Sequence, residues 1–431
     1  MIDLTAILIG CGLGLFAGLM PGLGYFMTLL LAFPLLLDMP VIELLIVYSA
    51  VVTISIYVGS VPATIYGIPG DTASMPVVYE SRNLKDLKQV SQAISGAAFG
   101  GFFGSVSVAL FCLLIINHLD SIKYFYSTLL VLILLVLASV IIIWTAGNKK
   151  SISLILYVAG FLLGMIGYNG SLDMSIFVIN DYMYQGLPRE VVLATLFALP
   201  NMVFYFNYFK SNSKSRSKES YSVWSVYFIN PINSAFYSAL GFVTGLMPGL
   251  TTIFSSMASY NIMSYFTKDP VKRIVASETG NNAGAFSCIL PLLIFGIPIS
   301  GSEALLLYFM EQNGFTSSET ELGPLLTSLV ANFMIINVVG LALAWPLSNY
   351  VKYFYRLDLR YVFGSVLIII FFSVMYSAYT SNSMLYYLSV ILVLAPFGIA
   401  LRNYYMLPLI FAYLISDKAI GSLVILKQLY F

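Results

Sequence analysis

The sequence predicts an all-α polytopic membrane protein made of two repeats with opposite orientations in the bilayer. Hydrophobic residues make up 59% of the 431 residues and charged residues only 9%, whereas a soluble domain has about 25% charged residues. Apolar stretches that can cross a bilayer, about 20 residues each, recur along the chain. Two short motifs occur twice in the same order, and the loops around the two copies carry opposite charge.

The apolar segments form two similar series, which together predict about 10–14 membrane segments. The first series has interrupted segments at 4–37 and 42–79, then segments at 92–117, 121–146, 151–170 and 186–209. The second has interrupted segments at 225–266 and 274–310, then segments at 322–350, 361–380, 383–401 and 404–430. We therefore divide the chain into a first membrane repeat (1–209), a polar linker (210–222) and a second membrane repeat (223–431).

The repeated motifs mark places where helices should break. Residues 14–23 (GLFAGLMPGL) match 241–250 (GFVTGLMPGL), and YGIPG at 66–70 matches FGIPI at 295–299. A proline removes one backbone hydrogen bond from a helix, and neighbouring elements must satisfy the freed groups. A single motif of this kind often marks only a kink. Two motifs in the same order at nearly equal offsets indicate an internal duplication, which is common in transporters.

The charged loops predict that the two repeats are inverted. Lysine and arginine accumulate in cytoplasmic loops, and here they gather at 80–88, 147–150, 210–219, 268–273, 352–360 and Arg402. Loops 38–43, 171–185, 311–321 and 376–383 lack a basic excess. When the motifs are aligned, loop 38–43 corresponds to basic loop 268–273, and basic loop 80–88 corresponds to acidic loop 311–321. Segment 225–266 should then be a hairpin that enters from the cytoplasm, with 4–37 entering from outside.

Inverted repeats bring the beginnings of broken helices together near the bilayer midplane. A helix N-terminus carries about half a positive charge and can bind an anion without a basic side chain. The candidate substrate-binding residues at these breaks are Pro21, Gly22, Gly24, Ser60, Pro69, Gly70, Thr72, Gly249, Thr251, Thr252, Asn281, Asn282, Pro298, Ser300 and Ser302. For the hydroxyl groups, the alternative is a bond to their own helix backbone in support of packing.

Three carboxylates in the apolar segments are candidates for ion coupling: Asp71, Glu278 and Glu303. A carboxylate at membrane depth is usually functional, and an unpaired buried charge is costly. Three solutions are open, namely a bound cation, protonation, or a substrate with its own positive group, and we expect a cation such as Na+. We expect no other cofactor and no metal centre, because the three cysteines and the single histidine lack metal-ligand spacing.

Five segments resemble the large membrane subunit of tripartite tricarboxylate transporters, the TctA family. They are GLFAGLMPGLG (14–24), YGIPG (66–70), GFLLGMIGYNG (160–170), ASETGNNAGAFSCILPLLIFGIP (276–298) and FGIALRNYYMLPLIFAYLIS (397–416). The resemblance implies import of a small organic anion of the carboxylate class, driven by a sodium or proton gradient. It also implies a multi-pass protein of a prokaryotic inner membrane, acting with a small membrane subunit and a periplasmic solute-binding protein. Pro21, Gly22, Pro69, Gly70, Asn281, Asn282 and Pro298 would line the substrate path.

Alternating access is the leading hypothesis, and two other functions compete with it. A passive channel would need a continuous polar stripe along several helices, whereas the polar residues here gather at the breaks. An intramembrane aspartyl protease needs two aspartates that share a proton. We expect no second aspartate to pair with Asp71 at membrane depth, and therefore no enzyme. The net charge of +1 gives no reason to expect a nucleic-acid partner.

Overall fold

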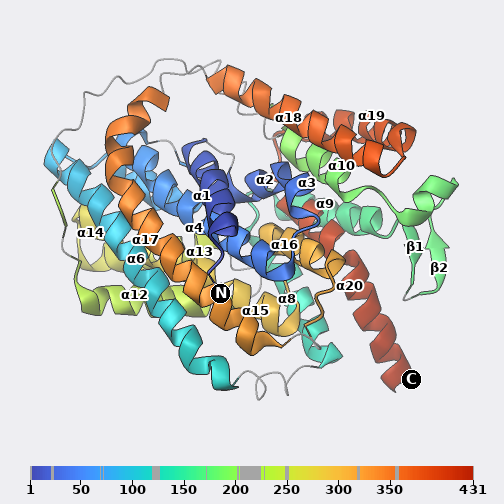
Figure 1. The fold of residues 1–431 in the computed structure, drawn as a ribbon, viewed down its shortest axis with the longest axis horizontal. Helices are drawn as coiled ribbons and strands as arrows, with labels where there is room; N and C mark the ends of the chain where they lie inside the picture. Colours follow the sequence, from blue (N-terminus) through green and yellow to red (C-terminus); the bar gives the residue numbers. More distant parts are fainter. Residues whose placement is uncertain are drawn as a thin grey trace.

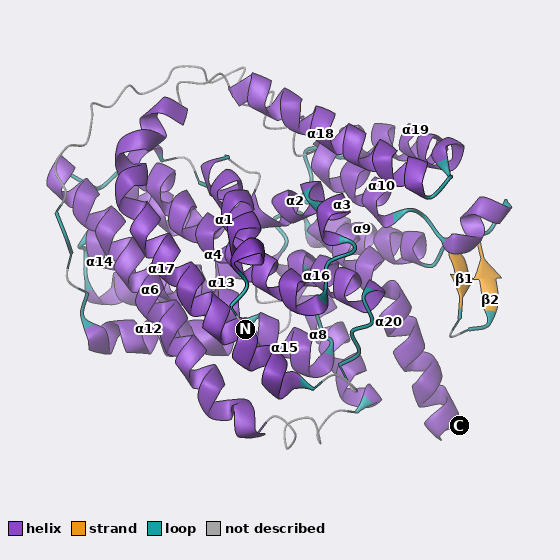
Figure 2. Ribbon diagram, viewed as in Figure 1, coloured by secondary structure: helices purple, strands orange, loops and turns teal. Residues whose placement is uncertain are grey.

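The structure is a computed structural model that describes residues 2–20, 24–67, 69–70, 72–118, 127–170, 172–200, 203, 225–227, 229–247, 252–317, 321–354 and 359–430. Almost all the described secondary structure is helical (Figures 1 and 2), as the composition predicted. The predicted linker at 210–222 lies outside the described residues.

The elements of the first half are α1 (Leu4–Leu19), α2 (Gly24–Leu31), α3 (Phe33–Leu36), α4 (Val41–Tyr66), η1 (Thr72–Ser74), α5 (Met75–Ser81), α6 (Leu87–Ile115), η2 (Ile116–His118), α8 (Thr128–Thr145), α9 (Lys150–Gly164), β1 (Gly167–Asn169), β2 (Met174–Ile176), η3 (Asp181–Gln185), α10 (Arg189–Leu193) and η4 (Ala194–Ala198). Those of the second half are α12 (Pro231–Leu246), α13 (Thr252–Phe266), α14 (Pro270–Ser287), α15 (Ile289–Phe295), α16 (Gly301–Gln312), α17 (Leu322–Phe354), α18 (Leu359–Thr380), α19 (Met384–Ala400) and α20 (Leu407–Tyr430).

Five of the described helices are long and apolar enough to cross a membrane: 41–66, 87–115, 128–145, 322–351 and 407–428. Shorter apolar helices lie at 4–19, 150–164, 367–380 and 384–400. The count of 10–14 segments therefore depends on the shorter helices and stays a prediction.

The sequence did not predict the small hairpin of β1 and β2, which pair antiparallel with Gly167 opposite Ile176. The tip is closed locally, because the Asn169 side chain accepts a hydrogen bond from the Leu172 amide at 3.0 Å. Asp173 has a positive φ of 50° and accepts a hydrogen bond from the Tyr168 hydroxyl at 2.7 Å. Residues 151–170 are therefore not one continuous apolar helix.

The repeated motifs produce repeated backbone geometry. α1 ends at an extended Met20 (φ −85°, ψ 113°), and α12 ends at an equally extended Met247 (φ −86°, ψ 117°). α4 ends at the left-handed Gly67 (φ 66°, ψ 31°), and α15 ends at the left-handed Gly296 (φ 59°, ψ 32°). All four positions lie one or two residues before a proline of the motifs, so the predicted interruptions of helix are confirmed.

Glycines in the first motif let helices pack closely. A Cβ added to Gly14 would lie 2.8 Å from the Ile54 Cβ, and one added to Gly18 would lie 2.7 Å from the Ser55 carbonyl oxygen. The equivalent Gly241 and Gly245 face α14 with the same lack of space. α1 accordingly packs along α4, and α12 packs along α14. Each pair then meets the other half of the chain, α4 against α17 and α14 against α6.

Loops that the charge pattern assigns to the same side of the membrane lie together. For the predicted cytoplasmic side, residues of 80–88 and 268–273 line one cavity, and the Asn148 side chain exchanges two 2.9 Å hydrogen bonds with the Tyr405 backbone. For the predicted outer side, the Asn313 amide donates to the Leu37 carbonyl at 2.7 Å. The Tyr386 hydroxyl donates to the Gly186 carbonyl at 3.0 Å.

Candidate functional site

The segments that follow the four predicted breaks meet inside the protein. Tyr25 near the start of α2 and Thr252 at the start of α13 place their hydroxyl oxygens 3.4 Å apart. These two residues are 227 positions apart, the same offset that separates Gly14 from Gly241. The Phe26 ring also packs beside Gly301 at the start of α16. The Ser256 hydroxyl of α13 donates to the Ala73 carbonyl of η1 at 2.6 Å.

The predicted site residues fall into two groups by what the structure describes. Pro21, Gly22, Asp71, Gly249 and Thr251 lie outside the described residues, as does the side chain of Thr72. Gly24 and Pro69 are half-buried, and Ser60, Gly70, Thr252, Glu278, Asn281, Asn282, Pro298, Ser300, Ser302 and Glu303 are buried. Most of the described members are therefore buried, and their role as a site stays a prediction.

Gly70 and Ser60 serve packing in the structure. A Cβ on Gly70 would approach the Gly18 carbonyl oxygen to 2.8 Å and the Gly59 Cα to 2.9 Å, so only glycine lets this break lie against α1 and α4. The Ser60 hydroxyl donates to the Tyr57 carbonyl at 2.8 Å. Ser60 thus follows the packing alternative that we gave for the hydroxyl groups.

Glu303 in the first turn of α16 is 3% exposed and joins the two halves of the chain. The Tyr48 hydroxyl of α4 donates to its Oε1 at 2.5 Å, and the Ser300 hydroxyl donates to its Oε2. Ser300 also caps the helix, and its oxygen lies 2.8 Å from the Ser302 hydroxyl. The helix N-terminus stabilises a negative charge at this position. Hydrogen bonds from neighbouring hydroxyl groups are thus a fourth way to stabilise a buried carboxylate, besides a bound cation, protonation and a positively charged substrate.

The face of α14 that turns into the protein is unusually polar. Ser277 lies 2.8 Å from the Ser256 hydroxyl, and the Asn282 amide donates to the Glu278 carbonyl at 2.9 Å. Among the described residues, neither amide atom of Asn281 has a hydrogen-bond partner, and neither has the Asn282 carbonyl oxygen. A buried polar group without a partner costs about 1–3 kcal/mol. Such a cost indicates a function beyond packing.

The sequence analysis missed three residues that take part in this polar interior. Tyr48 holds Glu303, and the Tyr57 hydroxyl of α4 donates to the Asn337 side chain of α17 at 3.1 Å. Asn337 carried a usable signal, because an amide in an apolar helix needs a partner. The two tyrosines gave none, since tyrosine is frequent throughout this chain (31 residues).

A second polar centre lies at the predicted cytoplasmic end. Glu80 at the end of α5 is 1% exposed and accepts hydrogen bonds from Asn83 (2.8 Å), Tyr260 (2.9 Å) and Arg273 (2.8 Å). Burial by itself raises the pKa of Glu80, but these three donors outweigh it and hold the pKa below its ordinary value. The pair of Glu80 and Arg273 connects the first half to the second.

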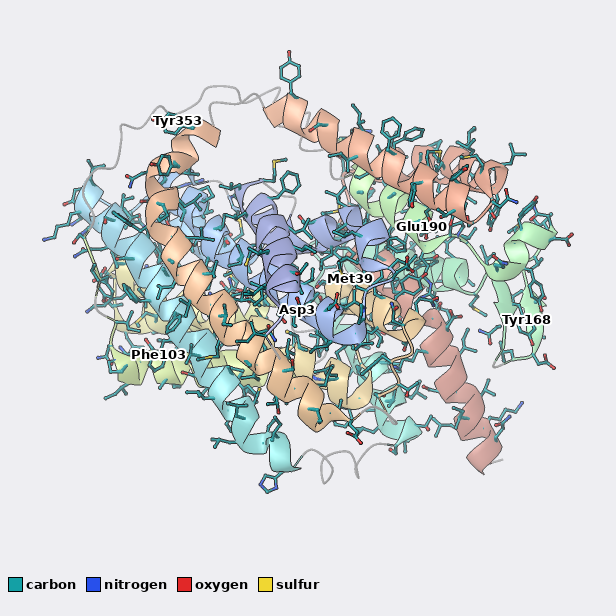
Figure 3. All side chains as sticks on the ribbon, in the orientation of Figure 1. Asp3, Met39, Phe103, Tyr168, Glu190 and Tyr353 are labelled. Carbon is teal, nitrogen blue, oxygen red and sulfur yellow. The ribbon has the colours of Figure 1, made fainter. Side chains whose placement is uncertain are left out.

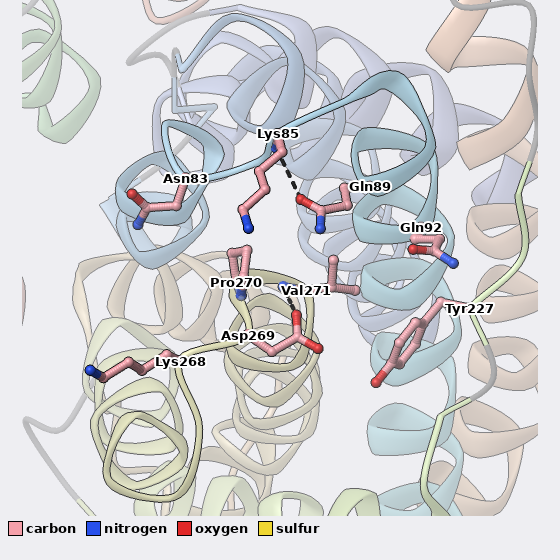
Figure 4. A pocket seen from close by; sticks show the side chains of 9 residues that line it. All are labelled: Asn83, Lys85, Gln89, Gln92, Tyr227, Lys268, Asp269, Pro270 and Val271. Carbon is pink, nitrogen blue, oxygen red and sulfur yellow. Dashed lines mark hydrogen bonds between the residues drawn. The ribbon is translucent and has the colours of Figure 1, made fainter.

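A cavity of about 480 Å³ is lined in part by Asn83, one of the partners of Glu80, and Figure 4 shows its lining residues. Its lining is formed by Asn83, Lys85, Gln89, Gln92, Tyr227, Lys268, Asp269, Pro270 and Val271. Lys85 and Lys268 come from different halves; in Figure 4 the ammonium group of Lys85 points toward Pro270, whereas that of Lys268 points away from it. The cavity lies at the predicted cytoplasmic surface, away from the four breaks.

Long apolar helices, interrupted helices that begin in the interior and polar side chains buried at the interruptions define a multi-pass α-helical membrane protein. A family model described as "Tripartite tricarboxylate transporter TctA family" matches residues 4–411. The chain therefore belongs to the TctA family, the membrane subunit of a transporter.

Two relatives from Agrobacterium vitis extend this similarity. One, called "Uncharacterized 52.8 kDa protein in TAR-I ttuC' 3'region", is 22% identical over 376 residues, which are 84% of this chain and 74% of the relative. Another, called "Uncharacterized protein in TAR-II ttuC' 3'region", is 26% identical over 138 residues, 30% of this chain and 57% of the relative. No solved structure matches the chain.

Proposed function

We propose that this protein is the permease subunit of a tripartite secondary transporter that imports a small organic anion of the carboxylate class by alternating access. The observation that carries the proposal is the meeting of α2 and α13 through Tyr25 and Thr252. Both helices begin directly after a Pro-Gly break, so their positive ends lie together in the interior. The start of α16 is less suited to an anion, because Glu303 already supplies a negative charge there.

Two features of the fold support inverted repeats as the basis of the movement. Loops that the motif alignment matches belong to different groups of contacts. Residues of 80–88 lie beside 268–273, and Leu37 lies beside Asn313. Equivalent helices also make equivalent contacts, α1 with α4 and α12 with α14. Rocking of such halves around a fixed central site is the usual form of alternating access.

The partners and the driving force follow from the family. We expect a small membrane subunit, a periplasmic solute-binding protein and a sodium or proton gradient across the inner membrane of a prokaryote. Asp71, Glu278 and Glu303 remain the candidate ion-coupling residues.

Uptake by proteoliposomes that contain the three subunits would test this function. Thr252→Val removes one hydroxyl beside the two helix ends and should raise the KM for the carboxylate about tenfold, the effect of one lost hydrogen bond to a charged group. Thr327→Val is the matched control, because Thr327 is exposed on α17 and its hydroxyl donates only to its own helix at Gly323. Full uptake by this subunit alone, with the gradient collapsed, would instead favour the passive channel.

A further inference from the structure

The polar face of α14 contains more hydrogen-bond acceptors than the surrounding described residues satisfy. We propose that Glu278, Asn281 and Asn282 form a Na+ site on α14, separate from the anion site at the helix ends. The inference rests on the proposed function, because it assigns the coupling ion of the same transporter. It also gives Asn281 and Asn282 a different ligand from the substrate that the family resemblance implied.

The spacing of the three residues gathers their oxygens on one side of the helix. Glu278 precedes Asn281 by three residues and Asn282 by four, and side chains at these spacings are neighbours on a helix surface. All three side chains are at most 2% exposed. Because the Asn282 amide nitrogen donates to the Glu278 backbone carbonyl, the orientation of this side chain is fixed, and its oxygen is left for another group.

The unsatisfied atoms identify the kind of ligand. The Asn281 and Asn282 carbonyl oxygens find no donor among the described residues; a carboxylate could accept from the Asn281 amide nitrogen, which is also without a partner there, but it would satisfy neither of these oxygens. A cation satisfies both oxygens at once, and carbonyl and carboxylate oxygens are the ligands that hard cations prefer. The three side chains comprise one carboxylate and two neutral amides, a set that suits a monovalent ion better than Ca²⁺ or Mg²⁺, which usually bind several carboxylates.

The neighbouring helices complete the enclosure. Tyr57 of α4 lies within electrostatic range of Glu278, and its hydroxyl proton is engaged by Asn337. The Tyr57 hydroxyl proton is therefore not available to Glu278. A Cβ on Gly101 of α6 would lie 2.6 Å from the Asn282 amide nitrogen, so the glycine lets α6 cover the site closely.

The same helix face connects the ion to the anion site. Ser277 lies one helical turn before Asn281 and contacts Ser256, which in turn donates to the carbonyl of Ala73 in η1. An ion held by α14 would therefore fix the positions of α13 and η1, two of the segments that follow the breaks. Occupancy by Na+ would prepare the helix ends for the carboxylate, which is the coupling that a symporter requires.

Thermal unfolding of the purified full chain in nanodiscs tests the site without substrate or partners. The melting temperature is measured against increasing NaCl, with KCl or N-methylglucamine chloride keeping the ionic strength constant. A saturable rise in Na+ but not in K+ is expected, because an ion that binds only the folded state stabilises it. Asn281→Ala and Asn282→Ala should each raise the half-saturating Na+ concentration about tenfold or more.

Asn332→Ala is the matched control. Asn332 is equally buried on α17 and its amide also donates to its own helix, but its carbonyl oxygen accepts a 2.8 Å bond from the Asp3 backbone amide. This variant should unfold at a lower temperature with an unchanged half-saturating Na+ concentration. Without Na+, Asn281→Ala should unfold no earlier than the wild type, because it removes an amide without partners.

Two results would overturn the inference: equal melting temperatures of the wild type in Na+ and K+, or an unchanged half-saturating Na+ concentration in both α14 variants. The measurement also separates this inference from the proposed function. Na+-specific stabilisation in a protein that fails to import carboxylates would refute only the proposed function. Carboxylate uptake by a protein with no such stabilisation would refute only the Na+ site.

Discussion

Replacement of Glu80 by alanine should strongly destabilise the contact between the two halves of the chain. Glu80 accepts one hydrogen bond from its own half, from Asn83, and two from the other half, from Tyr260 and Arg273. Its side chain is 2% exposed, and that of Arg273 is 18% exposed. The substitution therefore leaves a largely buried guanidinium without its carboxylate.

The size of the effect follows from what Arg273 keeps. Removing one partner of a buried ion pair costs about 3–5 kcal/mol. Here the remaining exposure screens part of the charge, and the guanidinium still donates to the Thr267 carbonyl at 2.8 Å. We therefore expect a loss of about 2–4 kcal/mol. Glu80→Gln keeps an acceptor and should cost less. Asp417→Ala breaks the less buried pair with Arg189 (side chains 56% and 27% exposed) and should cost less than Glu80→Ala.

Thermal or denaturant unfolding in nanodiscs measures this order, and pH adds an independent check. Because the pKa of Glu80 is lower in the folded protein than its ordinary value of 4.5, its stabilisation is complete above that pH. It is lost as the pH falls through the lower folded value. Glu80→Gln should remove this acid-dependent component. Equal losses in Glu80→Ala and Asp417→Ala, or an unchanged acid dependence in Glu80→Gln, would refute the reasoning.

Two further predictions concern packing and orientation. Gly14→Ala should destabilise the protein by about 1–3 kcal/mol, because the added Cβ would clash with α4. Gly12→Ala on the same helix adds a Cβ with nothing within 4 Å and should be neutral or stabilising by about 0.5–1 kcal/mol. Thermal unfolding compares the two variants, and equal effects would contradict the packing of α1 on α4. For orientation, cysteines introduced at two exposed positions, Lys85 and Tyr353, should be protected from an impermeant thiol reagent in whole cells; of these two, Tyr353 is labelled in Figure 3. Cysteines at Asp38 and Tyr182, also exposed, should react. The native cysteines are all buried. Labelling of Lys85→Cys would show that the protein has the opposite orientation in the membrane.

The breaks could be predicted from the sequence because their cause is local. Proline and glycine act on the backbone of their own helix, so the interruptions after Met20, Gly67, Met247 and Gly296 follow from the motifs alone. The structure adds that the motif glycines have a second role, in the packing of helices. Gly14 and Gly18 lie on the face of α1 that contacts α4, several residues before the break itself.

Contacts between distant helices could not be predicted in this way. Tyr48 and Glu303 are 255 residues apart, and no feature near either residue specifies the other. Glu190, which is labelled in Figure 3, is a similar case: it accepts hydrogen bonds from Ser377 of α18 and Tyr387 of α19. Arg273 was interpreted only as a cytoplasmic loop charge. Its pairing with Glu80 depends on how α5 packs against α14, and the hydropathy pattern does not specify that packing.

The two halves share a backbone plan but differ in their polar side chains, and this difference organises the proposed transport cycle. Glu303 occupies the start of α16 with a charge that Tyr48 and Ser300 already hold, so that helix end has little capacity for an anion. The ends of α2 and α13 carry no acidic residue in their first turns, which leaves them for the carboxylate. On α14, about one turn beyond Ser277, the Asn281 and Asn282 carbonyl oxygens find no donor among the described residues. We therefore expect anion and cation to bind to different elements that Ser256 connects, so that neither ion needs to neutralise the other by direct contact.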